Sequence, residues 1–372
     1  MHDYASRRAK VAARLREEGL GACMFRDSEG ARDTSIRYLT GQPGDALLVV
    51  SAEGRSILTA WDVNMAKAMA DVEEILPYSD FRRMPAEAMA GILPRLGVGG
   101  GSRVELPSAT SYPLYADFVE ALPDYDLVCR DGGMADFVLR MRAVKDAAEL
   151  EIYRVAARIT DDLADAIESA VRSGGIATEL DVALFIEREC RVRGCEGTGF
   201  ETLAAGPARS FGIHAFPPYG AGPFATRGLS ILDFGLNYEG YTTDVTMGFA
   251  RGPLDAKALQ MVELVNRAHD ECIAMIAPGV SSRDIALRAD AIFAEAGMVM
   301  PHALGHGVGL EAHESPAIRS REDNRDVLAA GHIVTIEPGL YDPELGGIRI
   351  EDDILVTPSG YEVLTRSRIV RL

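Results

Sequence analysis

Five residues in the second half of the chain have side chains that bind metal ions. They are four carboxylates and one imidazole: Asp233, Asp244, His306, Glu337 and Glu351. An oxygen-rich ligand set with one imidazole suits divalent ions, and a pair of such ions can activate a water held between them. If the five side chains converge, the sequence predicts a hydrolase with a two-metal centre.

Asp233 and Asp244 lie on two neighbouring apolar stretches that read as β-strands, with a short polar segment between them. A hairpin that turns at Tyr238 and Glu239 places Asp233 directly opposite Asp244. Side chains that face each other on antiparallel strands lie roughly 5 Å apart, and like charges at that distance destabilise a sheet. One such pair can occur on a solvated sheet face, so it does not by itself predict a cation.

Glu337 and Glu351 form a second pair of this kind, because a hairpin centred on Glu344 places them opposite each other. Both lie among apolar residues, and buried carboxylates must take up protons or bind cations. Two divalent ions carry four positive charges, and four carboxylates with a bridging hydroxide carry five negative charges. This near balance predicts a metal site here. His306 stands between two glycines, which allow the backbone to approach a crowded site.

The composition limits the class of protein. The 372 residues are 47% apolar and 25% charged, and the formal net charge is −18. These values are typical of a folded chain with a large core, and they argue against nucleic acid or an anionic membrane as a partner. No apolar run is long enough to span a bilayer. The five cysteines match no zinc pattern, so we expect reduced thiols in a cytoplasmic protein.

Two domains are expected. Residues 1–133 alternate short strands with helical patterns, which is typical of an α/β domain. Residues 134–372 combine long amphipathic helices with two strand-rich stretches, which predicts an α+β domain. Its first long helix begins at Asp146, which is spaced for a capping box with Glu149. The glycine run at 97–101 follows a helix and precedes a strand, so we interpret it as a turn and not as a nucleotide-binding loop.

The five candidate ligands stand in the segments ILDFG, GYTTDVT, LGHGVGLEAHESP, TIEPG and GIRIEDD. With these segments the chain resembles, from Val138 to the C-terminus, the pita-bread metallopeptidases: Xaa-Pro aminopeptidases, prolidases and methionine aminopeptidases. Residues 1–133 resemble the creatinase-like N-terminal domain of the Xaa-Pro branch, including the run YLTG at 38–41. The resemblance implies an α/β N-terminal domain, a pita-bread catalytic domain and cleavage of Xaa-Pro bonds.

The resemblance also implies how the metal ligands divide. Asp233 holds one ion, Asp244 and Glu351 bridge both ions, and His306 and Glu337 complete the shell of the other. The nucleophile is the water that bridges the two ions. Manganese or cobalt is expected, and zinc and iron remain alternatives, because the ligand types do not select among these metals.

Further roles follow from the same resemblance. Glu337 carries a proton to the leaving amine, and His214 contacts the substrate and the departing nitrogen. His302 and His313 position the peptide carbonyl and stabilise the oxyanion. Arg349 either supports the ligands or contacts a substrate carboxylate. The implied partner is a small peptide, and the implied assembly is a homodimer.

One departure from the family pattern keeps other functions open. The family commonly continues its second aspartate as D-x-T-R, whereas here Met247 stands at the arginine position. A hydrolase or lyase of the same fold that acts on a small non-peptide substrate is therefore an alternative. A binding module without enzymatic activity is a further alternative, which the complete ligand set disfavours.

Overall fold

The structure is a computed structural model that describes residues 2–372. It divides into two compact units, of which the first extends through Arg142 and the second spans Ala143–Leu372. Among the described residues, no helix combines the length and the apolar character needed to cross a bilayer.

Helix α6 (Met134–Ala143) accounts for the difference between this division and the boundary expected after Gly133. Met134 is buried, and its backbone N–H donates to the carboxylate of Glu105 in the first unit. The helix therefore continues the first unit, although the boundary expected from the sequence placed it at the start of the second.

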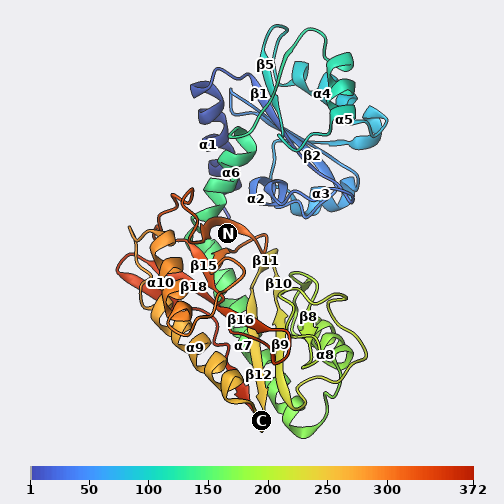
Figure 1. The fold of residues 1–372 in the computed structure, drawn as a ribbon. Helices are drawn as coiled ribbons and strands as arrows, with labels where there is room; N and C mark the ends of the chain where they lie inside the picture. Colours follow the sequence, from blue (N-terminus) through green and yellow to red (C-terminus); the bar gives the residue numbers. More distant parts are fainter. Residues whose placement is uncertain (1) are drawn as a thin grey trace. The chain divides into compact units, whose positions relative to one another are not determined.

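The first unit is built on one six-stranded sheet with the order β4-β3-β2-β1-β5-β6. Its strands β1, β2 and β5 are labelled in Figure 1. Only β2 is antiparallel to its neighbours, so β1, β3, β4, β5 and β6 all run in one direction. The strands are β1 (Ala22–Asp27), β2 (Ala46–Ser51), β3 (Ser56–Ala60), β4 (Glu74–Pro77), β5 (Arg103–Leu106) and β6 (Asp126–Cys129).

Helices cover this sheet, as an α/β domain requires. They are α1 (Tyr4–Glu17), α2 (Ser35–Thr40), α3 (Val63–Met69), α4 (Pro85–Arg95), α5 (Tyr112–Ala121) and the short 3-10 helix η1 (Tyr78–Phe81). The expected turn at 97–101 is confirmed: it joins α4 to β5, and its first and last glycines have φ of 79° and 83°.

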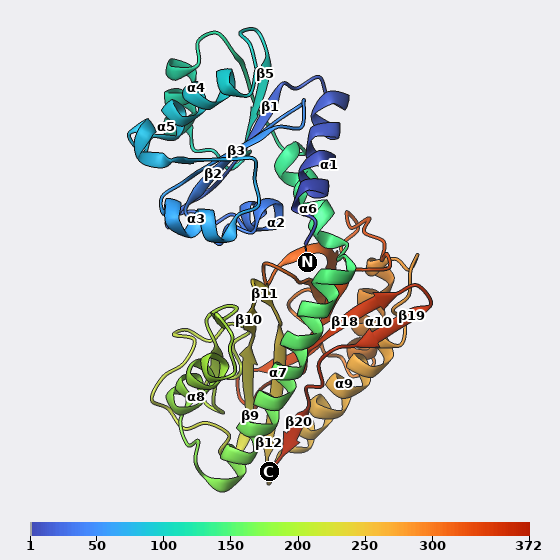
Figure 2. The same cartoon turned by 180° about the vertical axis from the view of Figure 1, so that it is seen from behind.

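The second unit begins with the 27-residue helix α7 (Ala147–Ser173), which runs along the strands in Figure 2. The predicted capping box is present, because Asp146 accepts from the backbone N–H of Glu149 and the Glu149 side chain accepts in return. Gly174 ends the helix with φ of 79°. Helix α8 (Glu179–Val192) follows and packs on β7 and β8.

The strands of the second unit form four sheets, with the orders β11-β10-β7, β20-β12-β9-β8, β14-β13-β15-β18-β19 and β16-β17. Their bounds are β7 (Gly197–Thr198), β8 (Leu203–Ala205), β9 (Gly228–Phe234), β10 (Leu236–Tyr238), β11 (Tyr241–Thr242), β12 (Val245–Arg251), β13 (Gly305–Gly307), β14 (Glu314–Ile318), β15 (Ile333–Ile336), β16 (Gly339–Asp342), β17 (Gly346–Arg349), β18 (Asp352–Thr357), β19 (Gly360–Val363) and β20 (Ile369–Arg371).

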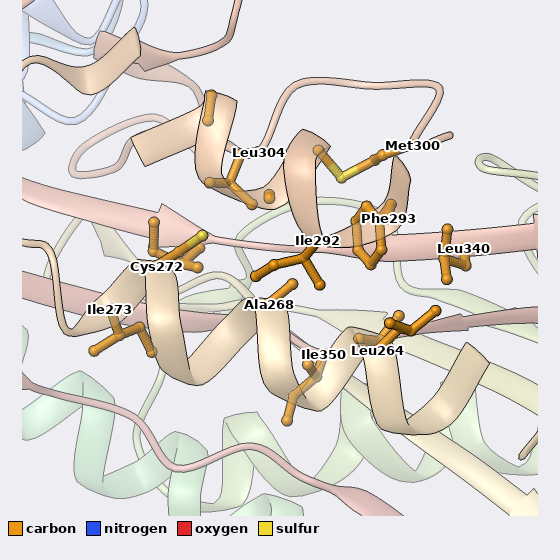
Figure 3. Close-up of a cluster of buried hydrophobic side chains, with 14 of the residues drawn as sticks. Leu264, Ala268, Cys272, Ile273, Ile292, Phe293, Met300, Leu304, Leu340 and Ile350 are labelled. Carbon is orange, nitrogen blue, oxygen red and sulfur yellow. The ribbon is translucent and has the colours of Figure 1, made fainter. Parts of the chain in front are cut away.

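Helices α9 (Ala256–Ile273) and α10 (Ser282–Ala294) hold the largest core of this unit. They pack on each other, and α9 also packs on β15, β16 and β17. Figure 3 shows side chains of both helices meeting those of Leu340 and Ile350 from the strand layer. Burial of large apolar side chains, worth about 1.5–3 kcal/mol each, therefore fixes the strands next to the acidic residues.

Candidate metal centre

All nine residues singled out from the sequence line one cavity of about 630 Å³ in the second unit. The set comprises the five candidate ligands, three histidines and one arginine: His214, Asp233, Asp244, His302, His306, His313, Glu337, Arg349 and Glu351. The structure thus brings together side chains that are up to 137 positions apart (214 to 351) in the sequence.

Three of the five candidate ligands form a compact group. Asp244, His306 and Glu351 each present a ligand atom within 4.8 Å of the other two. Glu337 is next to this group, with Oε1 3.6 Å from Nε2 of His306, and Oδ2 of Asp244 is 3.8 Å from the same nitrogen. Asp233 completes the lining of the cavity.

The hairpin that carries the two aspartates has a different register from the one predicted. Asp233 pairs with Thr246, so Asp244 lies two residues away from the facing position and the aspartates are diagonal neighbours. The predicted turn at Tyr238 and Glu239 is wrong, because Tyr238 pairs with Tyr241 and the turn residues are Glu239 and Gly240.

Both turn residues have positive φ, 49° for Glu239 and 89° for Gly240, as a type I′ hairpin turn requires. Glycine at the second turn position was the sequence signal that identifies this register. The shift of two positions keeps both aspartates on one face of the sheet, since side chains alternate with a period of two. The expected convergence therefore survives the error in register.

The second hairpin has the predicted register. Pairs on both sides of the acidic residues, Ile336 with Asp352 and Gly339 with Arg349, are centred on Glu344. The ladder is interrupted between these pairs, where Glu337 and Glu351 lie.

Their backbone groups pair with other strands instead. The N–H of Glu337 donates to the carbonyl of Leu304 at 2.8 Å, and that of Glu351 donates to the carbonyl of Thr246 at 3.1 Å. Each glutamate is thereby held beside a strand that carries another candidate ligand, which explains how two hairpins form one site.

His306 reaches the carboxylates because glycines flank it, as predicted. A Cβ on Gly305 would lie 2.0 Å from the carbonyl oxygen of Thr335, and one on Gly307 would lie 2.1 Å from that of Ser315. Nδ1 of His306 is 3.1 Å from the carbonyl oxygen of Gly307, so Nε2 is the nitrogen that faces the acids. Burial lowers the pKa of His306 to about 4, which keeps the imidazole neutral and able to bind a cation.

The carboxylates are strongly perturbed. Burial raises the pKa of Asp244 and of Glu351 well above the ordinary range, and neighbouring carboxylates raise each pKa further. Burial also raises the pKa of Glu337, to about 7, and that of Asp233, although Arg349 opposes both shifts. Two of these four acids are buried and two are partly exposed, and among the described residues Arg349 is the one arginine in an ion pair with any of them, so the protein itself does not balance their charge.

Divalent cations fit this arrangement. Oδ1 of Asp233 is buried and has no hydrogen-bond partner among the described residues, whereas its Oδ2 accepts from Arg349 at 2.6 Å. Unpaired buried carboxylate oxygens are costly unless a cation binds them. The donor set of carboxylate oxygens and one neutral imidazole is also the set that hard and borderline divalent ions prefer.

Arg349 is a buried support for the ligands. It donates to Asp233 at 2.6 Å, to the hydroxyl of Thr246 at 3.0 Å and to the hydroxyl of Tyr341 at 2.8 Å. Thr246 in turn donates to Oε2 of Glu351 at 2.8 Å. The sequence reasoning missed Thr246 and Tyr341, because a hydroxyl two residues after an aspartate and a tyrosine at a strand end carry no motif by themselves.

The three histidines outside the ligand set occupy different positions around the cavity. Nε2 of His302 is 3.0 Å from the Tyr341 hydroxyl, and burial lowers the His302 pKa to about 4. The ring of His313 lies 4.1 Å from the ring of His306, measured between centroids. His214 lies in the segment between β8 and β9, beside Ile213, whose carbonyl accepts from Arg349 at 3.4 Å.

Comparison with known proteins identifies the family. The profile of metallopeptidase family M24 matches residues 151–358, and that of the creatinase/prolidase N-terminal domain matches residues 7–144. The chain belongs to metallopeptidase family M24. It is therefore a metal-dependent peptidase, and the predicted enzymatic class is confirmed.

Curated relatives of this peptidase span nearly its whole length. The peptidase YqhT of Bacillus subtilis, described as uncharacterized, is 31% identical over 344 residues, which are 90% of this chain and 92% of that protein. A peptidase of Staphylococcus aureus, also described as uncharacterized, is 32% identical over 345 residues, with 89% and 92% of the two chains covered.

Solved structures confirm the predicted fold of the peptidase. The prolidase of Pyrococcus horikoshii is 25% identical, with a TM-score of 0.82 over 98% of this chain and 99% of that chain. The Xaa-Pro dipeptidase of Bacillus anthracis is 27% identical, with a TM-score of 0.83 over 99% and 100%. The X-Pro aminopeptidase of Thermotoga maritima is 27% identical, with a TM-score of 0.81 over 96% and 100%.

The structure also shows where Met247 of this M24 peptidase lies. Met247 is fully buried in an apolar cluster with Leu232 and Phe249, and it does not line the cavity. Strand alternation explains this position, since the preceding Thr246 faces the carboxylates. The positive charge beside the acids comes from Arg349 instead, so Met247 gives no support to a non-peptide substrate.

Proposed function

We propose that this protein is a dinuclear-metal exopeptidase that hydrolyses the Xaa-Pro bond at the N-terminus of peptides or in Xaa-Pro dipeptides. One observation carries the proposal: five candidate ligands and three histidines line a single cavity in an M24 peptidase. Solved structures 25–27% identical to the chain are named as a prolidase, an Xaa-Pro dipeptidase and an X-Pro aminopeptidase, which supports the substrate class.

We propose that two divalent ions bind here, with manganese or cobalt as the first candidates and zinc or iron as alternatives. Asp233 would bind one ion, Asp244 and Glu351 would bridge both, and His306 and Glu337 would bind the other. When bound, the ions supply an activated water as the nucleophile and polarise the peptide carbonyl. The unpaired Oδ1 of Asp233 supports this assignment.

We propose that Glu337 carries a proton in the reaction. Its Oε1 is 3.6 Å from Nε2 of His306, and its Oε2 is 3.9 Å from Nδ1 of His302. A carboxyl group in this position can take a proton from the nucleophilic water and give it to the leaving amine of proline. Both proton transfers are then made by one side chain on the wall of the cavity.

The remaining groups hold the peptide. His302, fixed by Tyr341, and His313, which lies beside His306, would position the carbonyl and stabilise the oxyanion. His214 would contact the substrate near the departing nitrogen. Arg349 would contribute to substrate binding mainly by holding other residues in place, because its N–H groups already donate to Asp233, Thr246 and Tyr341.

A substrate series tests this function. Purified protein, loaded with Mn²⁺ or Co²⁺ after chelation, is incubated with Ala-Pro and Ala-Pro-Ala, and with Ala-Ala and Ala-Ala-Ala as matched controls. We expect free proline from Ala-Pro and the dipeptide Pro-Ala from Ala-Pro-Ala, and much slower release of alanine from the controls. Cleavage of the dipeptide alone identifies a dipeptidase, and cleavage of the tripeptide identifies an aminopeptidase. Failure to cleave either proline peptide contradicts the proposal.

We further propose, from the resemblance to the Xaa-Pro branch, that the enzyme is a cytoplasmic homodimer. The five cysteines are all unpaired in the structure, which is compatible with a reducing compartment. Sedimentation velocity of the metal-loaded protein tests the dimer, and a monomer at micromolar concentration contradicts it.

A further inference from the structure

A second cavity, of about 570 Å³, lies wholly in the first unit. It is formed where three parallel strands of the sheet end: β1 contributes Arg26 and Asp27, Trp61 follows β3, and Tyr78 follows β4. In open α/β sheets, ligands bind in crevices outside the carboxyl ends of the strands. The position of this cavity, which we call the strand-end cleft, therefore matches the general place of a ligand site.

The charges of the strand-end cleft are only partly compensated within the unit. Arg32 pairs with Asp27 at 3.3 Å and with Asp45 at 3.0 Å, so these two carboxylates share a cation. In contrast, Arg26 and Arg83 have no carboxylate partner among residues 2–372, and Glu29 has no cationic partner there. The lining thus offers two guanidinium groups and one carboxylate to a ligand, and the Arg26 guanidinium also hydrogen-bonds Tyr78 in the cleft.

The cleft also presents an aromatic surface. Trp61 is 58% exposed, and the guanidinium of Arg83 lies 4.2 Å from the centroid of its ring. Arg83 has φ of 59°, a left-handed conformation that is unfavourable for a residue with a long side chain.

We propose that the strand-end cleft binds a free α-amino acid with a cyclic or aromatic side chain. Its carboxylate is received by Arg83 and Arg26, since a guanidinium matches a carboxylate in geometry and charge. Its ammonium group faces Glu29, and its ring packs on Trp61. A polyanion is excluded, because Asp27, Glu29 and Asp45 line the same cleft.

This ligand class suits a peptidase, because free amino acids are the products of peptide hydrolysis. The proposal does not rest on Xaa-Pro specificity, and the two can fail separately. The first is tested by binding to metal-free protein, whereas the second is tested by cleavage with metal-loaded protein.

Trp61 is the single tryptophan of the chain, so its fluorescence reports on this cleft alone. Chelated full-length protein is titrated with L-proline, L-phenylalanine, cyclopentanecarboxylate and inorganic phosphate. We expect a saturable change with at least one of the two amino acids, a weaker response to cyclopentanecarboxylate, which lacks the ammonium group, and none with phosphate. The absence of a saturable response to both amino acids, or an equal response to phosphate, overturns the proposal.

Two neighbouring arginines provide a matched pair of variants. Arg83→Gln removes the guanidinium over Trp61 and is expected to weaken amino-acid binding by roughly tenfold or more. Arg82→Gln is the control, since Arg82 has a similar φ of 53° but pairs with Glu87 and does not line the cleft. Equal affinity of the two variants contradicts the proposal.

Glu29→Gln provides an independent variant on an exposed turn, for use if Arg83→Gln loses its circular dichroism signal. It is expected to weaken binding of the amino acid while leaving binding of cyclopentanecarboxylate unchanged, because only the amino acid carries an ammonium group. An unchanged affinity for the amino acid in this variant overturns the assigned orientation and, with it, the proposal.

Discussion

Two sites with buried carboxylates in the second unit differ in how the negative charge is balanced. Glu314 is 2% exposed and pairs with Lys145, which is 1% exposed, at 3.1 Å. Asp244 and Glu351 are buried to a similar degree but face mainly each other, two further acids and one arginine. The first pair is complete within the protein, whereas the second group needs cations from outside, and this difference separates a structural ion pair from a metal site.

The largest effect is expected from Asp244→Asn. This change removes a proposed bridging carboxylate and should lower peptidase activity by roughly a thousandfold or more, because the ions supply several kcal/mol of transition-state stabilisation. The measurement is kcat/KM on the best Xaa-Pro peptide at saturating Mn²⁺. Activity within tenfold of the wild type shows that Asp244 is dispensable.

The same variant should lose activity without losing stability. In metal-free protein Asp244→Asn is expected to leave the free energy of unfolding unchanged or to raise it, since one of several mutually repelling buried carboxylates is removed. Urea unfolding of chelated protein measures this. A marked loss of stability indicates that the protein itself satisfies Asp244.

Breaking the ion pair of Lys145 and Glu314 should lower the free energy of unfolding. Lys145→Met breaks the buried ion pair with Glu314, and we expect a loss of about 3–5 kcal/mol in the free energy of unfolding. Lys257→Met is the control, because Lys257 is 54% exposed in its pair with Asp342 and its removal should change little. Similar unfolding curves for the two variants would show that the pair of Lys145 and Glu314 does not stabilise the fold as a buried ion pair does.

A smaller effect is expected from the buried pair of His269 and Asp352, whose Nε2 and Oδ2 atoms are 3.2 Å apart. Burial lowers the pKa of His269, but Asp270 and Asp352 outweigh burial and raise it from 6.5 to about 9. Because the pKa in the folded state is the higher one, the stabilisation is fully present below pH 6.5 and is lost as pH rises through about 9.

The pH dependence of unfolding tests this pair. We expect wild-type protein to lose about 3 kcal/mol between these limits, from about 1.36 kcal/mol for each pKa unit. His269→Gln should lose much less over the same range. Parallel pH profiles for the two proteins contradict a charged His269.

The residues of the candidate site could be predicted from the sequence, whereas most residues that hold them in place by hydrogen bonds could not. Asp233 and Glu337 stand in local motifs, and the hairpin around Glu344 fixes the register of the second pair. The predicted register of the first hairpin was wrong by two positions, because the turn residues are Glu239 and Gly240 and not Tyr238 and Glu239. Its side-chain period of two nevertheless kept the aspartates on one face.

The supports depend on contacts between segments that are far apart in the sequence. Thr246 bonds to Glu351 across 105 positions, and the carboxylate of Asp353 accepts from the backbone N–H of Asp244 across 109. Neither residue has a local pattern that reveals such a partner. The extent of the first domain was missed for the same reason, since the buried contact of Met134 with Glu105 assigns α6 to it.

Metal stoichiometry tests the central claim most directly. Chelated protein is dialysed against Mn²⁺ or Co²⁺, and bound metal is measured by inductively coupled plasma mass spectrometry for the wild type and for Glu351→Gln. We expect two ions per wild-type chain and a clear loss of bound metal in the variant. Less than one bound ion in the wild type, or equal binding in both proteins, would mean that the acidic residues of this cavity do not form a metal centre.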